Sequence, residues 1–289
     1  MNGFATILQA SLREHARRRT AYVALAIGTL FVALYSLGIH FIWAEIIRDI
    51  ESGRRGPGGV FELKQLVPAT MFGLSMFATW FLSAVAATFM AAGGIRGEAE
   101  RGILQHVLVR PVGRHTVLVA RLTAAALLAV LFLFVVVTCC ALATRLITGW
   151  QPGNLLNALL LLALGTTGVT AIAIAFSVRL HGVAAGIASL MLFGLGLVGG
   201  LLEQLGTGIQ VSSVRQSGEW VSTALPFEAM YQAALHQITS DVAGVSGIVV
   251  RLGPFGGARA ASSILVLWAI AWTAAIIALA AWRLRRRDF

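Results

Sequence analysis

Six stretches of the sequence are apolar over a length that can cross a lipid bilayer. A membrane helix needs roughly 20 apolar residues to span the hydrocarbon core, and lipid offers no partner for the amides of an open backbone. Polar residues are too scarce to cover a water-soluble body of 289 residues, because 58% of the chain is hydrophobic and 12% is charged. The sequence therefore predicts an all-α integral membrane protein, a single domain over residues 1–289, with transmembrane helices at 22–43, 68–92, 122–144, 155–178, 183–202 and 264–282.

The distribution of charge predicts which side of the membrane each end faces. If the N-terminus is cytoplasmic, 14 of the 22 Lys and Arg residues but only 4 of the 12 acidic residues lie on the cytoplasmic side. The whole formal net charge of +10 then falls on that side, as the positive-inside bias requires. We expect an N-in, C-in topology in which the basic residues meet anionic headgroups rather than nucleic acid.

The N-terminal residues 1–20 have the pattern of an amphipathic helix. Apolar residues share one helical face, and Arg13 and Arg17 lie on the opposite side, which is typical of a helix at the membrane interface. The apolar face consists of Phe4, Ile7, Leu8 and Leu12. After the first span, helical spacing continues to Gly53, and a short loop is expected to lead into the second span at Pro68.

The extracytoplasmic segment 203–263 is the least lipophilic part of the chain. Pro226 precedes an apolar stripe, which predicts an amphipathic helix on the outer surface between the fifth and sixth spans. The stripe consists of Phe227, Met230, Tyr231, Ala234, Leu235 and Ile238. The Gly- and Ser-rich remainder up to residue 263 is either loop or re-entrant backbone.

Several kinds of chemistry are disfavoured by what the sequence lacks. No predicted span carries a charged residue near its centre, which disfavours an ion-driven carrier. The six histidines fall at span ends or in loops, and the adjacent pair Cys139-Cys140 has no metal-binding spacing, so we expect neither a metal site nor catalytic residues. The only lysine, Lys64, does not follow a glycine, so the chain has no phosphate-binding loop of the form GxxxxGK(S/T). An ATP-driven role would require a partner that binds ATP and magnesium.

Residues 98–121 carry the most informative pattern, E-A-E-R-G-I-L-Q-H-V-L-V-R-P-V-G-R-H-T-V-L-V-A-R. The stretch resembles the first cytoplasmic loop of ABC-2 type permeases, the type V exporters, in which an acidic pair, a glycine, apolar residues and a Pro-Val-x-Arg motif follow one another. Ile103 replaces the usual threonine and Arg121 the usual lysine. Residues 225–231 resemble an outer segment of the NosY-like subgroup. The matching positions are Glu98, Glu100, Gly102, Leu104, Val107, Leu108, Pro111, Val112 and Arg114.

The resemblance implies that the cytoplasmic loop 94–116 is a coupling helix that docks on a cytoplasmic ABC ATPase subunit, present in two copies. The alternative is a solvated basic loop without a partner. The implied coupling residues are Glu98, Glu100, Arg101, Gly102, Ile103, Leu104, Val107, Leu108, Pro111 and Arg114, with Arg179 and His181 in the second cytoplasmic turn. It also implies a second permease subunit, with a homodimer favoured, in the bacterial cytoplasmic (inner) membrane.

The translocation path is expected along the second and fifth spans, which the resemblance puts at the dimer axis. The candidate residues are Ser75, Thr79, Ser83, Gly186, Gly196 and Gly200, although small residues at this spacing serve helix packing equally well. Five phenylalanines and no buried charge suit an amphipathic, lipid-like or drug-like substrate moved outward; they are Phe72, Phe77, Phe81, Phe89 and Phe193. The alternatives are a NosY-like permease that supplies sulfur or copper species to periplasmic cofactor assembly, perhaps with a periplasmic accessory protein and with Cys139 and Cys140 involved, a non-transporting scaffold, and another carrier.

Overall fold

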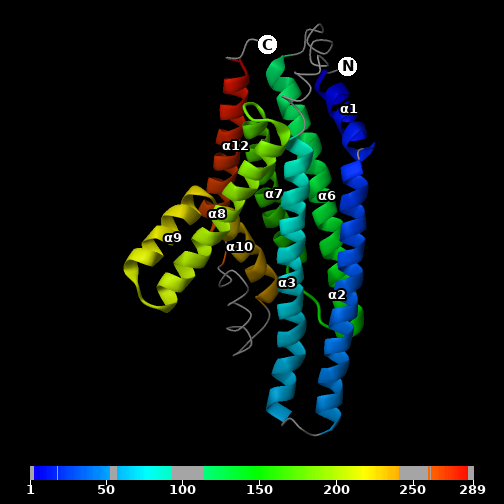
Figure 1. The fold of residues 1–289 in the computed structure, drawn as a ribbon. Helices are drawn as coiled ribbons and strands as arrows, with labels where there is room; N and C mark the ends of the chain where they lie inside the picture. The colour runs from blue at the N-terminus through cyan, green and yellow to red at the C-terminus, as the bar shows by residue number, and fades with distance from the viewer. Residues whose placement is uncertain are drawn as a thin grey trace.

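The computed structural model describes residues 3–17, 19–52, 57–92, 113–240, 260 and 262–285. Within these ranges every regular element is a helix, and six helices are long and apolar enough to cross a membrane. The predicted all-α, six-span fold class is therefore confirmed (Figure 1). The helices are α1 (Gly3–Arg17), α2 (Arg19–Glu51), α3 (Pro57–Ala92), α6 (Arg114–Thr148), α7 (Leu155–Ser177), α8 (Gly182–Gly208), α9 (Ser212–Ala224), α10 (Phe227–Thr239) and α12 (Ser263–Arg285).

The centre of the bundle is built by α3, α6 and α7, which pack against one another, with α8 against α3 and α7. Helix α2 packs on α6 and α3, and α12 on α7 and α6, so both lie at the periphery and leave broad apolar faces exposed. In water such faces would be costly, but in a bilayer they meet lipid chains of the same polarity. The exposed faces are thus a property of a membrane-embedded bundle.

Helix α3 begins well before the predicted start of the second span. It starts at Pro57 and contains Pro68 in its interior, so the prediction of a loop leading to Pro68 is wrong. Proline inside membrane-protein helices is tolerated because neighbouring helices and local adjustments satisfy the freed backbone groups. Helix α2 has 33 residues and α3 has 36, which correspond to about 50 Å and 54 Å, against about 30 Å of hydrocarbon. The pair extends beyond the outer end of α7 (Figure 1).

Helices α8 and α9 form a tight hairpin that projects from the side of the bundle (Figure 1). Helix α8 continues to Gly208, beyond the predicted end of the fifth span at residue 202, and the chain turns at Gln210, whose φ of 57° is left-handed. Glycines let the two backbones approach: a side chain at Gly206 or Gly218 would overlap the backbone of the opposite helix. Helix α9 is an element that the sequence analysis did not predict.

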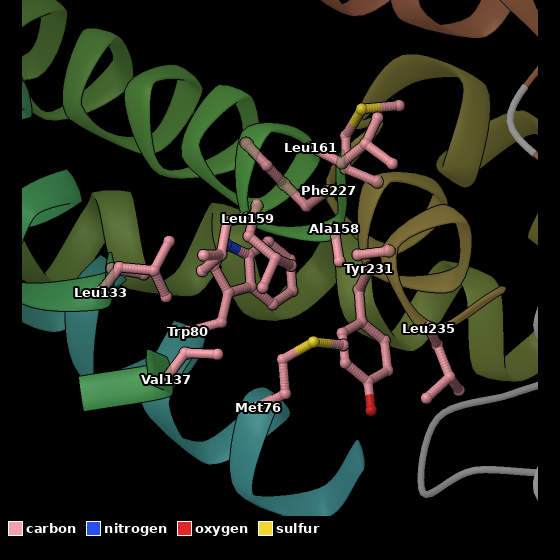
Figure 2. Close-up of a cluster of buried hydrophobic side chains, with 14 of the residues drawn as sticks. Met76, Trp80, Leu133, Val137, Ala158, Leu159, Leu161, Phe227, Tyr231 and Leu235 are labelled. Atoms are coloured by element: carbon pink, nitrogen blue, oxygen red, sulfur yellow. The ribbon is translucent and has the colours of Figure 1, made fainter. Parts of the chain in front are cut away.

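Helix α10 follows Pro226, as predicted, and its apolar stripe is buried except for the half-buried edges. The helix does not lie on the outer surface, however, because it packs against α7, α8 and α3 in the interior. Figure 2 shows Tyr231 of α10 beside Trp80 of α3, and the two rings stack at 5.9 Å between centroids. This enclosed position is a correction to the predicted surface helix; residues 241–259 lie outside the described residues.

Helix α1 turns its apolar side toward the bundle and its arginines outward. It packs against α6, and Arg13 and Arg17 are exposed, as its amphipathic pattern predicts. His15 is buried and bridges two helices: Nδ1 lies 2.7 Å from the Ser11 carbonyl oxygen, and Nε2 lies 2.9 Å from the carbonyl oxygen of Met90 in α3. The imidazole thus ties α1 to the last turn of α3.

Candidate functional site

The end of the bundle that carries the N-terminus also carries the predicted coupling segment. Residues Glu98, Glu100, Arg101, Gly102, Ile103, Leu104, Val107, Leu108 and Pro111 lie outside the described residues. The flanking structure is described: α3 ends at Ala92, and α6 begins at Arg114, of whose side chain nothing is described. The segment therefore leaves and re-enters the bundle at the end to which His15 anchors α1.

The second predicted coupling element is the turn between α7 and α8. Arg179 and His181 are exposed there, and the turn is closed by backbone hydrogen bonds, from the amide of Arg179 to the Phe176 carbonyl at 2.9 Å and from Ala185 to the His181 carbonyl at 2.8 Å. Helices α7 and α8 pack against each other, as so short a connection requires. Both side chains project from the bundle, at a place where a soluble partner has access.

The hydroxyls predicted to line the path lie inside the subunit. Ser75 and Thr79 donate to carbonyls of their own helix, of Phe72 and Ser75 respectively, both at 2.8 Å. Ser83 donates to the carbonyl of Ala129 in α6, also at 2.8 Å. All three are buried, and their hydrogen bonds hold helices in place. Their burial argues against a role in lining a path between two subunits.

The predicted glycines of α8 also face the interior of the same subunit. Gly186, Gly196 and Gly200 are buried. A Cβ at Gly196 would approach Phe227 at 2.9 Å, and a Cβ at Gly200 would overlap the carboxylate of Glu228. These two glycines therefore make room for α10, which is the helix-packing alternative for small residues at this spacing.

The opposite sides of α3 and α8 are exposed and apolar. Phe81 and Phe89 of α3 are 42% and 47% exposed, whereas Phe72 and Phe193 are fully buried. The two exposed faces adjoin, since α3 packs on α8 and the rings of Phe81 and Phe193 lie 6.0 Å apart. The exposed residues of the combined face are Leu74, Phe81 and Phe89 on α3 and Val183, Ile187 and Met191 on α8.

A carboxyl group lies at depth in the bundle, at a place where the sequence analysis expected none. Glu228 is fully buried on α10, and its Oε1 accepts a hydrogen bond from Nε2 of Gln232 at 2.6 Å. The preceding residue, Phe227, packs on Gly168 and Gly196, which lie near the middle of α7 and α8. The premise that no ionisable group lies at depth is therefore wrong.

Tyr231 completes this polar row along α10. Its hydroxyl donates to the carbonyl oxygen of Gly73 in α3 at 3.2 Å. Burial, and secondarily the nearby Glu228 carboxyl, raise the pKa of Tyr231, so the phenol stays protonated and can donate. The i, i+4 spacing of Glu228 and Gln232, together with Gly200 on the facing helix, is the sequence signal that would have indicated a buried polar pair.

Six long apolar helices around a helix-packed core define this chain as a multi-pass membrane protein. The residues that the structure describes include no cluster of three or more His, Cys, Asp or Glu side chains placed to hold a metal ion. The family model described as ABC-2 family transporter protein matches residues 6–289, so the chain belongs to the ABC-2 family of transporters. It is a membrane component of a transport system, and membership of this family of permeases implies a partner ATPase. No curated protein matches the sequence.

Proposed function

We propose that the chain is the permease subunit of an ATP-driven ABC exporter of the bacterial inner membrane. It moves an amphipathic, lipid-like or drug-like substrate outward and relies on a separate ATPase subunit that binds ATP and magnesium. The observation that carries the proposal is the match of the ABC-2 family over residues 6–289, which include all six long apolar helices. The need for a partner follows from the sequence, whose only lysine is outside any phosphate-binding loop.

The proposed docking surface for the ATPase is the end of the bundle at which α1 begins and α12 ends (Figure 1). Three features support the choice. The segment from Glu98 to Pro111 connects α3 and α6 at this end, the α7–α8 turn exposes Arg179 and His181 there, and His15 joins α1 to α3. A push on the segment from below would reach α3 and α6 directly, since both helices continue from it into the core.

The proposed path lies between two permease subunits, along the exposed face of α3 and α8. This placement replaces the buried hydroxyls and glycines with exposed apolar side chains, chiefly Phe81, Phe89 and Met191. An apolar wall suits a substrate with a hydrocarbon or aromatic part and serves a bare ion poorly. Closure of the two ATPases would change the separation of the facing helices, which is a rigid-body switch rather than a chemical step in this chain.

The first test is purification of the tagged chain from its native cells in mild detergent. A co-purifying soluble protein with a GxxxxGK(S/T) motif, in about equal amount, is the expected result. Charge reversal by Glu98→Arg should lower ATPase recovery, whereas Glu51→Arg, the same change at the exposed far end of α2, should leave it unchanged. A stable preparation without a nucleotide-binding partner would refute the exporter proposal, and equal ATPase recovery in both variants would refute the docking assignment.

A further inference from the structure

A cavity of about 520 Å³ opens between α2 and α6 near the end of the bundle that carries α1. The volume falls within the range of about 300–1,000 Å³ that ligand pockets occupy. Small residues on α2 create the space, and Gly28 lets the helices touch at Phe132, where an added Cβ would come within 2.7 Å. The lining consists of Ala16, Ala21, Ala24, Leu25, Gly28, Thr29, Val32, Ala33, Met90, Leu128, Leu131, Phe132, Val135, Val136 and Cys139.

Polar groups on the wall are few and largely satisfied. The Thr29 hydroxyl donates to the carbonyl of Leu25 in its own helix at 2.9 Å, and the thiol of Cys139 is a weak donor at most. A hydrophilic ligand would lose its hydration in such a cavity and gain no hydrogen bonds in return. The walls therefore select a hydrocarbon.

The length of the cavity matches one leaflet of a bilayer. On α2 the lining runs from Ala21 to Ala33, which is about 18 Å along a helix; on α6 it runs from Leu128 to Cys139, about 16 Å. Half of the hydrocarbon core is about 15 Å thick. One acyl chain, extended from the interface toward the midplane, has this shape.

Positive charge lies at the end of the cavity that faces the membrane surface. Ala16 of α1 is part of the lining, and Arg13 and Arg17 near it are exposed. The sequence continues with Arg18 and Arg19, so this end stays positive despite Glu14. Arginine forms strong bonds with phosphate oxygens, and basic residues beside a membrane helix favour anionic lipids.

We infer that the cavity between α2 and α6 binds one acyl chain of an anionic phospholipid, whose phosphate lies at Arg13 and Arg17. The site is distinct from the α3–α8 face proposed for transport, and the inference requires only that the bundle is embedded in a membrane. Because Met90 lines the cavity and its carbonyl accepts from His15, a bound lipid contacts α1, α2 and the end of α3 together. Lipid binding thus stabilises the end of the bundle from which the predicted coupling segment leaves.

The test uses the full chain, with any subunits that co-purify, in nanodiscs that contain a photoactivatable phospholipid. Phosphatidylglycerol and phosphatidylcholine with the same diazirine-bearing chain are compared, and mass spectrometry locates the labelled residues. Ala24→Phe fills the cavity, and Ala26→Phe is the matched control, because Ala26 is exposed on the same helix and does not line the cavity. A double variant, Arg13→Gln with Arg17→Gln, alters the headgroup end only.

We expect the label to concentrate on lining residues of α2 and α6, with a preference for the anionic lipid of roughly tenfold. Ala24→Phe should reduce this labelling severalfold, Ala26→Phe should not, and the double arginine variant should remove the headgroup preference while retaining chain labelling. Because the arginine variant leaves the walls unchanged, the inference stays testable if Ala24→Phe fails to fold. Labelling spread evenly over the exposed faces of α2, α8 and α12, or Cys139–Cys139 cross-links between copies of the chain, would overturn it.

Discussion

A single methyl group at Gly200 tests the position of α10 directly. In the structure the fully buried carboxylate of Glu228 occupies the space that a side chain at this position would need. Gly200→Ala should therefore force α8 and α10 apart or displace the carboxylate from Gln232. If α10 lay on the outer surface, as its amphipathic pattern alone suggests, the methyl group would meet no obstacle.

The expected loss of stability follows from two terms. Overpacking of a filled interior costs about 1–3 kcal/mol. Disruption of the 2.6 Å hydrogen bond between Gln232 and Glu228 adds about 1–3 kcal/mol, because the groups stay buried without each other. The sum of about 2–5 kcal/mol corresponds to a fall in Tm of roughly 5–15 °C, at about 2–4 °C per kcal/mol for a chain of this size.

Thermal unfolding in detergent, followed by tryptophan fluorescence, measures this fall. Gly194→Ala is the matched control: it lies in the same helix, and an added Cβ meets no atom within 4 Å. This control should keep or slightly raise Tm, because alanine is favoured over glycine in a helix by about 1 kcal/mol. A double variant with Glu228→Ala frees the space, so its Tm should exceed the sum of the two single effects. Equal Tm values for Gly200→Ala and Gly194→Ala, or strictly additive effects in the double variant, would refute the enclosed α10.

Three further predictions concern the helix contacts. His15→Leu removes two buried hydrogen bonds of α1 and should speed trypsin cleavage after Arg17, with unchanged cleavage contradicting the attachment of α1. A membrane-permeant maleimide should label Cys139, which is exposed, and spare Cys140, which is buried; equal labelling in single-cysteine variants would contradict this. Tyr35→Phe removes a 2.6 Å bond to the Thr144 hydroxyl and should cost only about 1 kcal/mol, because Thr144 still donates to the Cys140 carbonyl; a Tm drop as large as that of Gly200→Ala would refute this.

The six spans were predictable because a membrane leaves one solution for long apolar runs. Lengths were less predictable, since polar and mixed sequence at the ends of α2 and α3 continues the helix after the lipid ends. Pro68 illustrates the error: proline usually marks a boundary, but here helix precedes and follows it.

The position of α10 was not predictable from its own residues. Glu228 and Gln232 indicate a wet face, yet they satisfy each other within the helix and fit against Gly200. Helix α9 was missed because its polar sequence has no apolar stripe of its own, and its stability depends on close approach to α8 through Gly206 and Gly218. Both depend on contacts between distant segments, which local patterns do not record. The predicted coupling residues 98–111 stay a prediction from resemblance.

Pro68 gives α3 a mechanical property as well as a boundary that misled the sequence analysis. Proline has no amide hydrogen, so the helix lacks the bond to the carbonyl of Lys64, and bending is easiest there. The outer turns of α3, beyond the end of α7, therefore form a lever arm, while Ala69 and Phe72 clamp the inner part in the core (Figure 1). Sideways force on the arm is absorbed at this joint, so the part of the pair outside the lipid can swing without disturbing the packing around Trp80.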